Sequence, residues 1–101
     1  MAKPFQYHFE WDPSKARENY RKHGIAFDRA ATIFHDANAL SEFDLQHSDR
    51  EERWITMGLD QTGTIVVACH TFQETGDNSA TIRLVSARKA TKNEMISYRR
   101  E

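Results

Sequence analysis

The chain has 101 residues, a formal net charge of −1 and one cysteine. This length predicts one domain, residues 1–101, whose core is large enough to fold without a disulfide, and the lone Cys69 excludes an internal one. The sequence has neither a signal-peptide pattern nor an apolar run near the roughly 20 residues of a membrane helix, so we expect a cytoplasmic protein without membrane contacts.

The charges are unevenly distributed. Lys and Arg outnumber Asp and Glu by five to three in residues 1–24 and by six to two in residues 83–101, but residues 25–82 contain three against ten. Two basic ends therefore flank an acidic middle. This arrangement can form an electropositive face on a nearly neutral protein, and it can equally let the acidic middle attract a basic partner.

The N-terminal residues predict a short strand and a helix. Residues 5–9 alternate apolar and polar side chains, which is typical of an edge strand. Asp12 can accept free amide hydrogens and Pro13 suits the first helical position, so a helix should begin there and run to Lys22. Gly24 then suits the left-handed conformation that ends a helix.

The middle of the chain predicts a second helix and three strands. The helix covers residues 28–34, with its alanines, Ile33 and Phe34 facing the core. A short strand is expected at residues 39–43, and an alternating strand at residues 54–59 leads into a turn at residues 60–63. Residues 64–72 are apolar on both parities, which indicates a central strand.

The C-terminal third predicts a polar, mobile loop at residues 73–80, a last strand at 81–87 and a helix at 91–98. Glu94 follows Thr91 by three residues, as in a capping box. The order of elements predicts an α+β domain with a small antiparallel sheet of about four strands, two N-terminal helices and one C-terminal helix.

The stretch from Val85 to Thr91 leads from an apolar strand directly into a basic turn. A rigid support can hold Arg88 and Lys89 against a phosphate or a developing anion, and the planar Arg88 group can bind phosphate oxygens in bidentate fashion. An ordinary solvated turn is the alternative.

Arg83 and Arg88 differ by an odd number of residues, so a regular strand directs them to opposite faces. They can line one site only if the strand bulges or ends before Arg88, and we expect Arg88 to lie just past its end. His70, on the neighbouring strand, can share the face of Arg83; the alternative is a semi-buried histidine with satisfied hydrogen bonds.

The five histidines lack metal-ligand spacing with one another or with Cys69, so we expect no metal and no other cofactor. His47, in a His-Ser-Asp loop, carries no weight because such loops are common. Cleaving RNA without a metal requires a base for the 2′-hydroxyl, cations for the charged transition state and an acid for the leaving oxygen.

Seven segments together resemble the BrnT family. They are Phe9–Pro13, Lys22–Gly24, Phe27–Ala31, His47–Asp49, Glu51–Trp54, Met57–Gly58 and Ile82–Thr91. Each motif is weak alone, but their order and spacing are specific, and the resemblance extends from about Phe9 to Tyr98. It implies a RelE-like endoribonuclease, the toxin of a bacterial type II toxin–antitoxin pair, which cleaves mRNA and is neutralised by a BrnA antitoxin.

The resemblance and the chemistry together select the candidate site residues. His23, Arg53, Arg83 and Arg88 are the candidate catalytic residues, and Lys22, His70, Lys89 and Tyr98 are the candidate RNA contacts.

Several of these residues have structural alternatives. His23 can stabilise a helix C-terminus, Arg53 can form an exposed salt bridge with a neighbouring glutamate, and Tyr98 can be an aromatic at the edge of the core. The family commonly has Glu-Arg in the last helix, where this chain has Glu94 and Met95, so Arg99 or Arg100 must supply that charge.

The rival hypothesis is a non-catalytic binding module that acts through a complex with its antitoxin; the net charge of −1 and Met95 favour it. DNA contact is expected only through the antitoxin, because no helix here has the basic and polar residues of a recognition helix. Residues 36–52 are acidic and could contact a basic partner.

Overall fold

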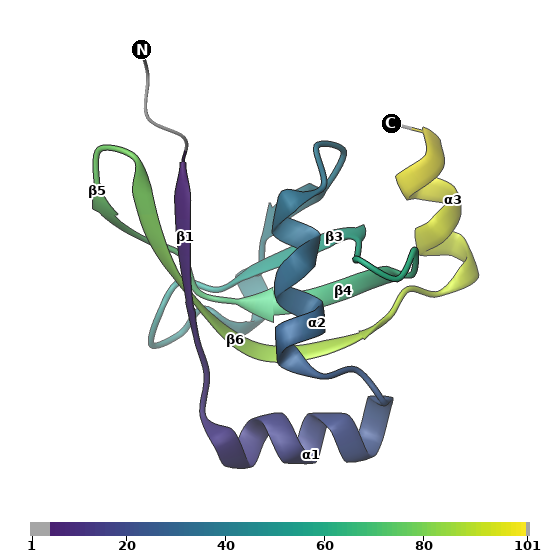
Figure 1. Cartoon of the computed structure of the whole chain (residues 1–101), viewed down its shortest axis with the longest axis horizontal. Coiled ribbons are helices and arrows are strands. Elements are labelled where there is room, and N and C mark those ends of the chain that lie inside the picture. Colours follow the sequence, from purple (N-terminus) through teal and green to yellow (C-terminus); the bar gives the residue numbers. More distant parts are fainter. Residues whose placement is uncertain (1–4, 101) are drawn as a thin grey trace.

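The computed structural model describes residues 5–100 (Figure 1). In chain order the elements are β1 (Gln6–Glu10), α1 (Pro13–His23), α2 (Phe27–Ala31), the 3-10 helix η1 (Thr32–His35), β2 (Leu40–Phe43), the 3-10 helix η2 (Leu45–His47), β3 (Trp54–Leu59), β4 (Ile65–His70), β5 (Gln73–Gly76), β6 (Ser79–Lys89) and α3 (Lys92–Arg100). Within residues 5–100, no helix is long and apolar enough to span a bilayer.

The strands form one mixed sheet in the order β1-β6-β4-β3-β2, with β5 also paired to β6. β1 runs parallel to β6, and the other pairs are antiparallel. The α+β class is thus confirmed, but the prediction of an antiparallel sheet of about four strands is wrong. Residues 73–80 are not a loop: β5 pairs with the start of β6, and its exposed residues, three polar ones and a glycine, gave no apolar alternation to reveal it.

The ends of α1 follow the prediction. The Asp12 carboxylate accepts a hydrogen bond of 2.8 Å from Ser14 N, and Gly24 has a φ of 70° and donates from its backbone N to Tyr20 O at 2.8 Å. The predicted second helix is divided into α2 and η1.

α2 and η1 cover one face of the sheet (Figure 1). The fully buried core there includes Ile25, Ile33, Val66, Ile82 and Leu84. Because side chains alternate along a strand, the odd-numbered residues of β3 and β4 face the opposite side, which we call the open face.

β6 contains a bulge where it passes the end of β4. His70 pairs with Leu84, whereas the preceding residue Cys69 pairs with Ser86, so Val85 is the extra residue. A bulge of this kind bends the strand and shifts its alternation by one residue.

The bulge places Arg83 and Arg88 on the same face. Leu84 is buried before the bulge and Ala87 is buried after it, so the core-facing parity changes from even to odd. Arg88 lies inside β6, which ends at Lys89; the prediction that it follows the strand is wrong. Of the two conditions under which Arg83 and Arg88 can line one site, the bulged strand is the one observed.

Asn19 of α1 holds the strand beyond the bulge. β1 pairs with β6 only as far as Arg83. Further along, the buried Asn19 side chain accepts from Ala87 N at 3.0 Å and donates to Ala87 O at 2.9 Å and to Ile25 O at 3.1 Å. On the side of β6 that β1 no longer covers, one side chain therefore takes the place of a neighbouring strand.

Candidate functional site

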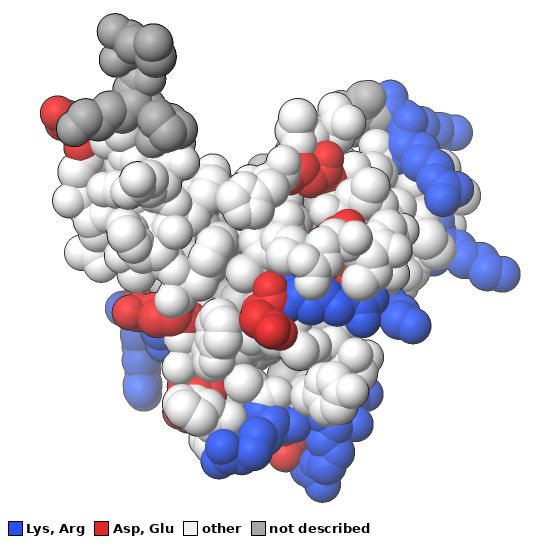
Figure 2. Space-filling model, viewed as in Figure 1, with Lys and Arg blue, Asp and Glu red and all other residues white. Residues whose placement is uncertain are grey.

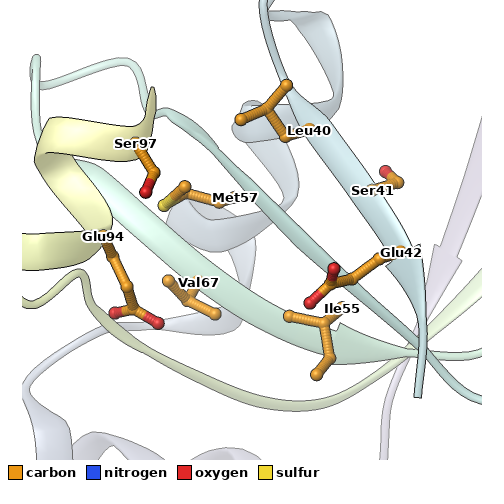
Figure 3. A pocket seen from close by; sticks show the side chains of 8 residues that line it. All are labelled: Leu40, Ser41, Glu42, Ile55, Met57, Val67, Glu94 and Ser97. Atoms are coloured by element: carbon orange, nitrogen blue, oxygen red, sulfur yellow. The ribbon is translucent and has the colours of Figure 1, made fainter. Parts of the chain in front are cut away.

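Three adjoining cavities lie over the open face. The first lies between β2, β3, β4 and α3, and Figure 3 shows Glu94 and Ser97 of α3 pointing towards Met57 and Val67. The second shares Ile55 and Val67 with the first and adds residues of β6. The third extends to the start of α1 and shares two residues, His47 and Arg53, with the second. We call the three together the open groove.

Arg88 lies in the middle cavity and is bound to α3. Its Nη1 and Nη2 donate to the two carboxylate oxygens of Glu94 at 2.7 and 3.0 Å. This bidentate contact, together with the Thr91 backbone N, lowers the pKa of Glu94 to about 2. Glu94 also completes the predicted capping box, because Thr91 N donates to it at 2.8 Å and its own N donates to Thr91 Oγ1 at 3.2 Å.

Arg53 and Arg83 lie on either side of Glu51. Arg83 Nη2 donates to Glu51 Oε2, and Arg53 Nη2 lies 3.4 Å from Glu51 Oε1. The bond from Arg83 is the main cause that lowers the pKa of Glu51. Arg53 Nε is buried and has no hydrogen-bond partner among the described residues, so one donor in the groove is unused.

The three predicted arginines therefore converge on one groove, but each is paired with a carboxylate. The open groove lies along their side chains, which are 27%, 34% and 42% exposed for Arg53, Arg83 and Arg88. An incoming phosphate can reach them only by competing with Glu51 and Glu94.

Asp44 and His47 also belong to the groove, although the sequence did not single them out. His47 Nδ1 lies 2.9 Å from Asp44 Oδ2, and His47 lines both arginine-containing cavities. The available signal was the spacing of three residues between Asp44 and His47, and only His47 belongs to a segment that resembles the BrnT family. It was passed over because nothing local distinguishes this loop from a solvated one.

His70 lies on the core face, not beside Arg83. It is 3% exposed, its Nε2 is 2.6 Å from Thr56 Oγ1, and its Nδ1 is 2.9 Å from Thr71 O. Burial lowers its pKa, which favours the neutral ring. The register pairs His70 with the core residue Leu84, so it does not share the face of Arg83, and the alternative of a buried histidine with satisfied hydrogen bonds is the one observed.

His23 and Lys22 end α1 and are exposed, and neither lines the open groove. Lys22 Nζ lies 3.6 Å from a Glu18 oxygen. The structure therefore does not bring His23 together with the arginines. Lys89 is exposed at the end of β6 and also does not line the groove.

Tyr98 attaches α3 to the segment after η1. Its hydroxyl donates to Asp36, and this bond raises the pKa of Tyr98 to about 12. Asp36 also accepts from Leu59 N at 2.8 Å. The contact of Tyr98 with Asp36 thus positions α3.

Figure 2 shows the helix-covered side of the molecule. Lys and Arg gather over α1 and over α3, and between them acidic residues lie beside a further group of basic ones. This pattern matches the two basic ends and acidic middle of the sequence. Among residues 5–100, no group of three or more His, Cys, Asp or Glu side chains is arranged to hold a metal ion.

Comparison with known proteins identifies the family. The family model described as the ribonuclease toxin BrnT of type II toxin–antitoxin systems matches residues 11–94. Among solved structures, that of the Brucella abortus ribonuclease toxin BrnT is similar, with a TM-score of 0.53, 19% sequence identity, and coverage of 87% of this chain and 99% of that one. At this identity the likeness supports the fold. Comparison with curated proteins gives no significant match. The chain therefore belongs to the BrnT family of ribonuclease toxins of type II toxin–antitoxin systems.

Proposed function

We propose that this protein is an endoribonuclease toxin that cleaves mRNA in the open groove without a metal ion. Membership of a ribonuclease toxin family supports the reaction. The observation that carries the site is the bulge at Val85, which brings Arg83 and Arg88 to the face where Arg53 also lies.

In this proposal, Arg53, Arg83 and Arg88 neutralise the scissile phosphate and its transition state. Guanidinium groups suit the task because they stay charged and offer paired donors to phosphate oxygens. The partly exposed contacts of Glu51 need not prevent binding, since ion pairs of this kind are worth only about 0–1 kcal/mol, whereas phosphate must displace the bidentate contact between Glu94 and Arg88. RNA phosphates would replace Glu51 and Glu94 as partners of the arginines.

We assign Lys22, His23 and Lys89 to contacts with RNA that flanks the cleaved bond, because they lie outside the groove. Tyr98 is proposed to keep α3 in place at one end of the groove. His70 is proposed to support the sheet rather than contact RNA, because it is buried.

The proposed protein partner is a BrnA-type antitoxin that covers the open groove. The acidic segment 36–52 includes Glu42, Asp44 and Glu51 of the groove, so a partner with basic side chains fits it. Any DNA contact is assigned to the antitoxin.

Cleavage of total RNA by the purified, antitoxin-free protein tests the proposal. We expect cleavage that persists in EDTA and falls at least tenfold in Arg83→Ala and Arg88→Ala, because charge stabilisation is usually the largest catalytic contribution. Arg21→Ala is the matched control, since Arg21 is exposed on α1 and pairs with Glu18. Loss of cleavage in EDTA, or an inactive wild-type protein, would contradict the proposal.

A non-catalytic binding module remains the second candidate, because all three groove arginines are already paired with carboxylates. Induced expression separates the two. A toxin arrests growth, and Arg88→Ala relieves the arrest while the protein still folds; a binding module causes neither arrest nor RNA loss but retains its partner.

A further inference from the structure

Asp44 and His47 form a pair between the arginine-lined cavities. His47 Nδ1 is 2.9 Å from Asp44 Oδ2, and the His47 side chain is 61% exposed whereas that of Asp44 is 7% exposed. A carboxylate oxygen accepts in such a contact, which assigns the ring proton to Nδ1. The lone pair of Nε2 is then available to a ligand, as in other carboxylate–histidine pairs that set the tautomer.

The loop that carries the pair is held by three hydrogen bonds. Asp44 N donates to Arg53 O at 2.8 Å, Ser48 Oγ donates to Asp44 O at 2.6 Å, and Arg53 N donates to Ser48 Oγ at 3.0 Å. These bonds close residues 44–53 into a compact loop whose end leads directly into β3. The imidazole and the Arg53 guanidinium therefore line the same two cavities from the two ends of one closed loop.

Building on the proposed function, we infer that His47 is the general base of RNA cleavage and that Asp44 is its positioning residue. His47 Nε2 takes the proton of a ribose 2′-hydroxyl, and the 2′-oxygen bonds to the adjacent phosphorus. The bond from phosphorus to the 5′-oxygen breaks, and that oxygen keeps the electron pair and takes a proton from water. The resulting hydroxide removes the proton from the His47 ring. The products carry a 2′,3′-cyclic phosphate and a 5′-hydroxyl.

The charged and titratable groups around His47 come from several elements. Its own loop contributes Asp44, Asp49, Arg50 and Glu51. The other elements contribute Lys15 of α1, Arg53 before β3, Cys69 of β4, and Arg83 and Arg88 of β6.

None of these neighbours changes charge near neutral pH as an imidazole does. Burial raises the pKa of Cys69, and Arg83 lowers that of Glu51. Lysine and arginine stay charged near neutral pH, and among ordinary side chains only histidine changes charge there.

The test is the pH dependence of kcat and KM on a defined mRNA transcript. For His47→Gln we expect kcat to fall about 100- to 10,000-fold, the range for loss of general acid–base catalysis, with KM within about twofold. The limb of the profile near neutral pH should disappear. His35→Gln is the matched control, because His35 is exposed at the end of η1, outside the groove.

Asp44→Asn provides the second variant and a readout that a structural role would not change. An amide can donate to Nδ1 and reverse the tautomer, so kcat should fall and the ¹⁵N shifts of the His47 ring should exchange their order. If circular dichroism shows that His47→Gln is unfolded, the pH dependence of kcat for Asp44→Asn tests the role of His47 instead.

The outcomes distinguish this inference from the function on which it rests. Wild-type protein that leaves RNA intact overturns both. Wild-type cleavage combined with an unchanged profile in His47→Gln overturns the role of His47 alone and leaves the nuclease proposal standing. Fragments that end in a 3′-hydroxyl, or cleavage of an oligonucleotide of the same sequence made with 2′-deoxynucleotides, overturn the 2′-hydroxyl route. The route is supported if the wild-type protein gives fragments with 2′,3′-cyclic phosphate ends and both His47→Gln and Asp44→Asn fail to give them.

Discussion

Asn19 and Glu51 are the two single residues with most influence on the groove. Asn19 supplies both backbone partners of Ala87, just beyond the bulge that brings Arg88 to the face of Arg83. Glu51 holds Arg53 and Arg83 together on that face. Asn19 thus supports the bend of β6, and Glu51 holds the two guanidinium groups near each other.

Replacing Asn19 with Ala should destabilise the fold by about 2–3 kcal/mol, because Ala87 N and two carbonyls lose buried partners. Urea unfolding followed by circular dichroism measures this. Asn38→Ala is the control, since Asn38 is exposed and should change stability by less than about 0.5 kcal/mol. A change that small for Asn19→Ala would mean that Ala87 does not depend on it.

Glu51→Gln should strengthen RNA binding. The variant keeps the shape of the side chain but removes the carboxylate that competes with phosphate for Arg53 and Arg83. Since such pairs are worth up to about 1 kcal/mol, affinity for a 2′-O-methyl RNA should rise about two- to fivefold in a fluorescence titration. Glu52→Gln makes the same charge change on an exposed neighbour. Equal gains in both variants would show that only net charge matters.

At the scale of elements, α3 depends on a few polar contacts. None of its residues is fully buried, and it is attached through the pair of Arg88 with Glu94 and the bond of Tyr98 to Asp36. Its first turn also borders the groove (Figure 3). The position of this helix therefore controls how exposed the Arg88 side chain is.

Acid should release α3 before the rest of the domain. The pKa of Glu94 is lowered from 4.5 to about 2 in the folded state, chiefly by Arg88. Its contribution to stability is therefore present above pH 4.5 and is lost as the pH falls towards 2. Amide exchange in α3 should accelerate across this range, and Glu94→Gln should show fast exchange at neutral pH already. Slow exchange in Glu94→Gln at every pH would contradict this.

At the scale of the whole molecule, local signals predicted the parts and long-range contacts decided the site. α1, with Asp12 and Gly24 at its ends, and the capping box of α3 could be predicted because neighbouring residues determine them. β3 and β4 could be predicted from apolar patterning. The location of Arg83 and Arg88 on one face was anticipated only under the condition that the strand bulges or ends before Arg88.

The features that were missed depend on pairing between distant segments. β5 is polar and exposed, so only its pairing with β6 makes it a strand. The extra residue Val85 is visible only in the register with β4, and the same register directs His70 into the core. The contact of Asp44 with His47 depends on the closure of a loop by Arg53, which no local pattern reports.

A BrnA-type antitoxin that covers the groove should stabilise the toxin and inhibit it. A partner present at 100 times its Kd adds about 2.7 kcal/mol to the stability of a protein that it binds only when folded. In a domain of this size that raises Tm by about 10–20 °C, since each kcal/mol corresponds to about 4–8 °C. Thermal unfolding and RNA cleavage should be measured in the same titration. Stabilisation without inhibition would place the partner away from the groove.

NMR mapping of a bound, uncleavable RNA tests most directly whether RNA lies in the open groove. The ¹⁵N-labelled protein is titrated with a 2′-O-methyl oligonucleotide, and the shifts of backbone and arginine signals are followed. We expect the largest changes at Arg53, Arg83, Arg88 and His47, with little change over α2. Shifts centred on α2 and η1, or shifts scattered evenly over the molecule, would contradict the assignment of the groove.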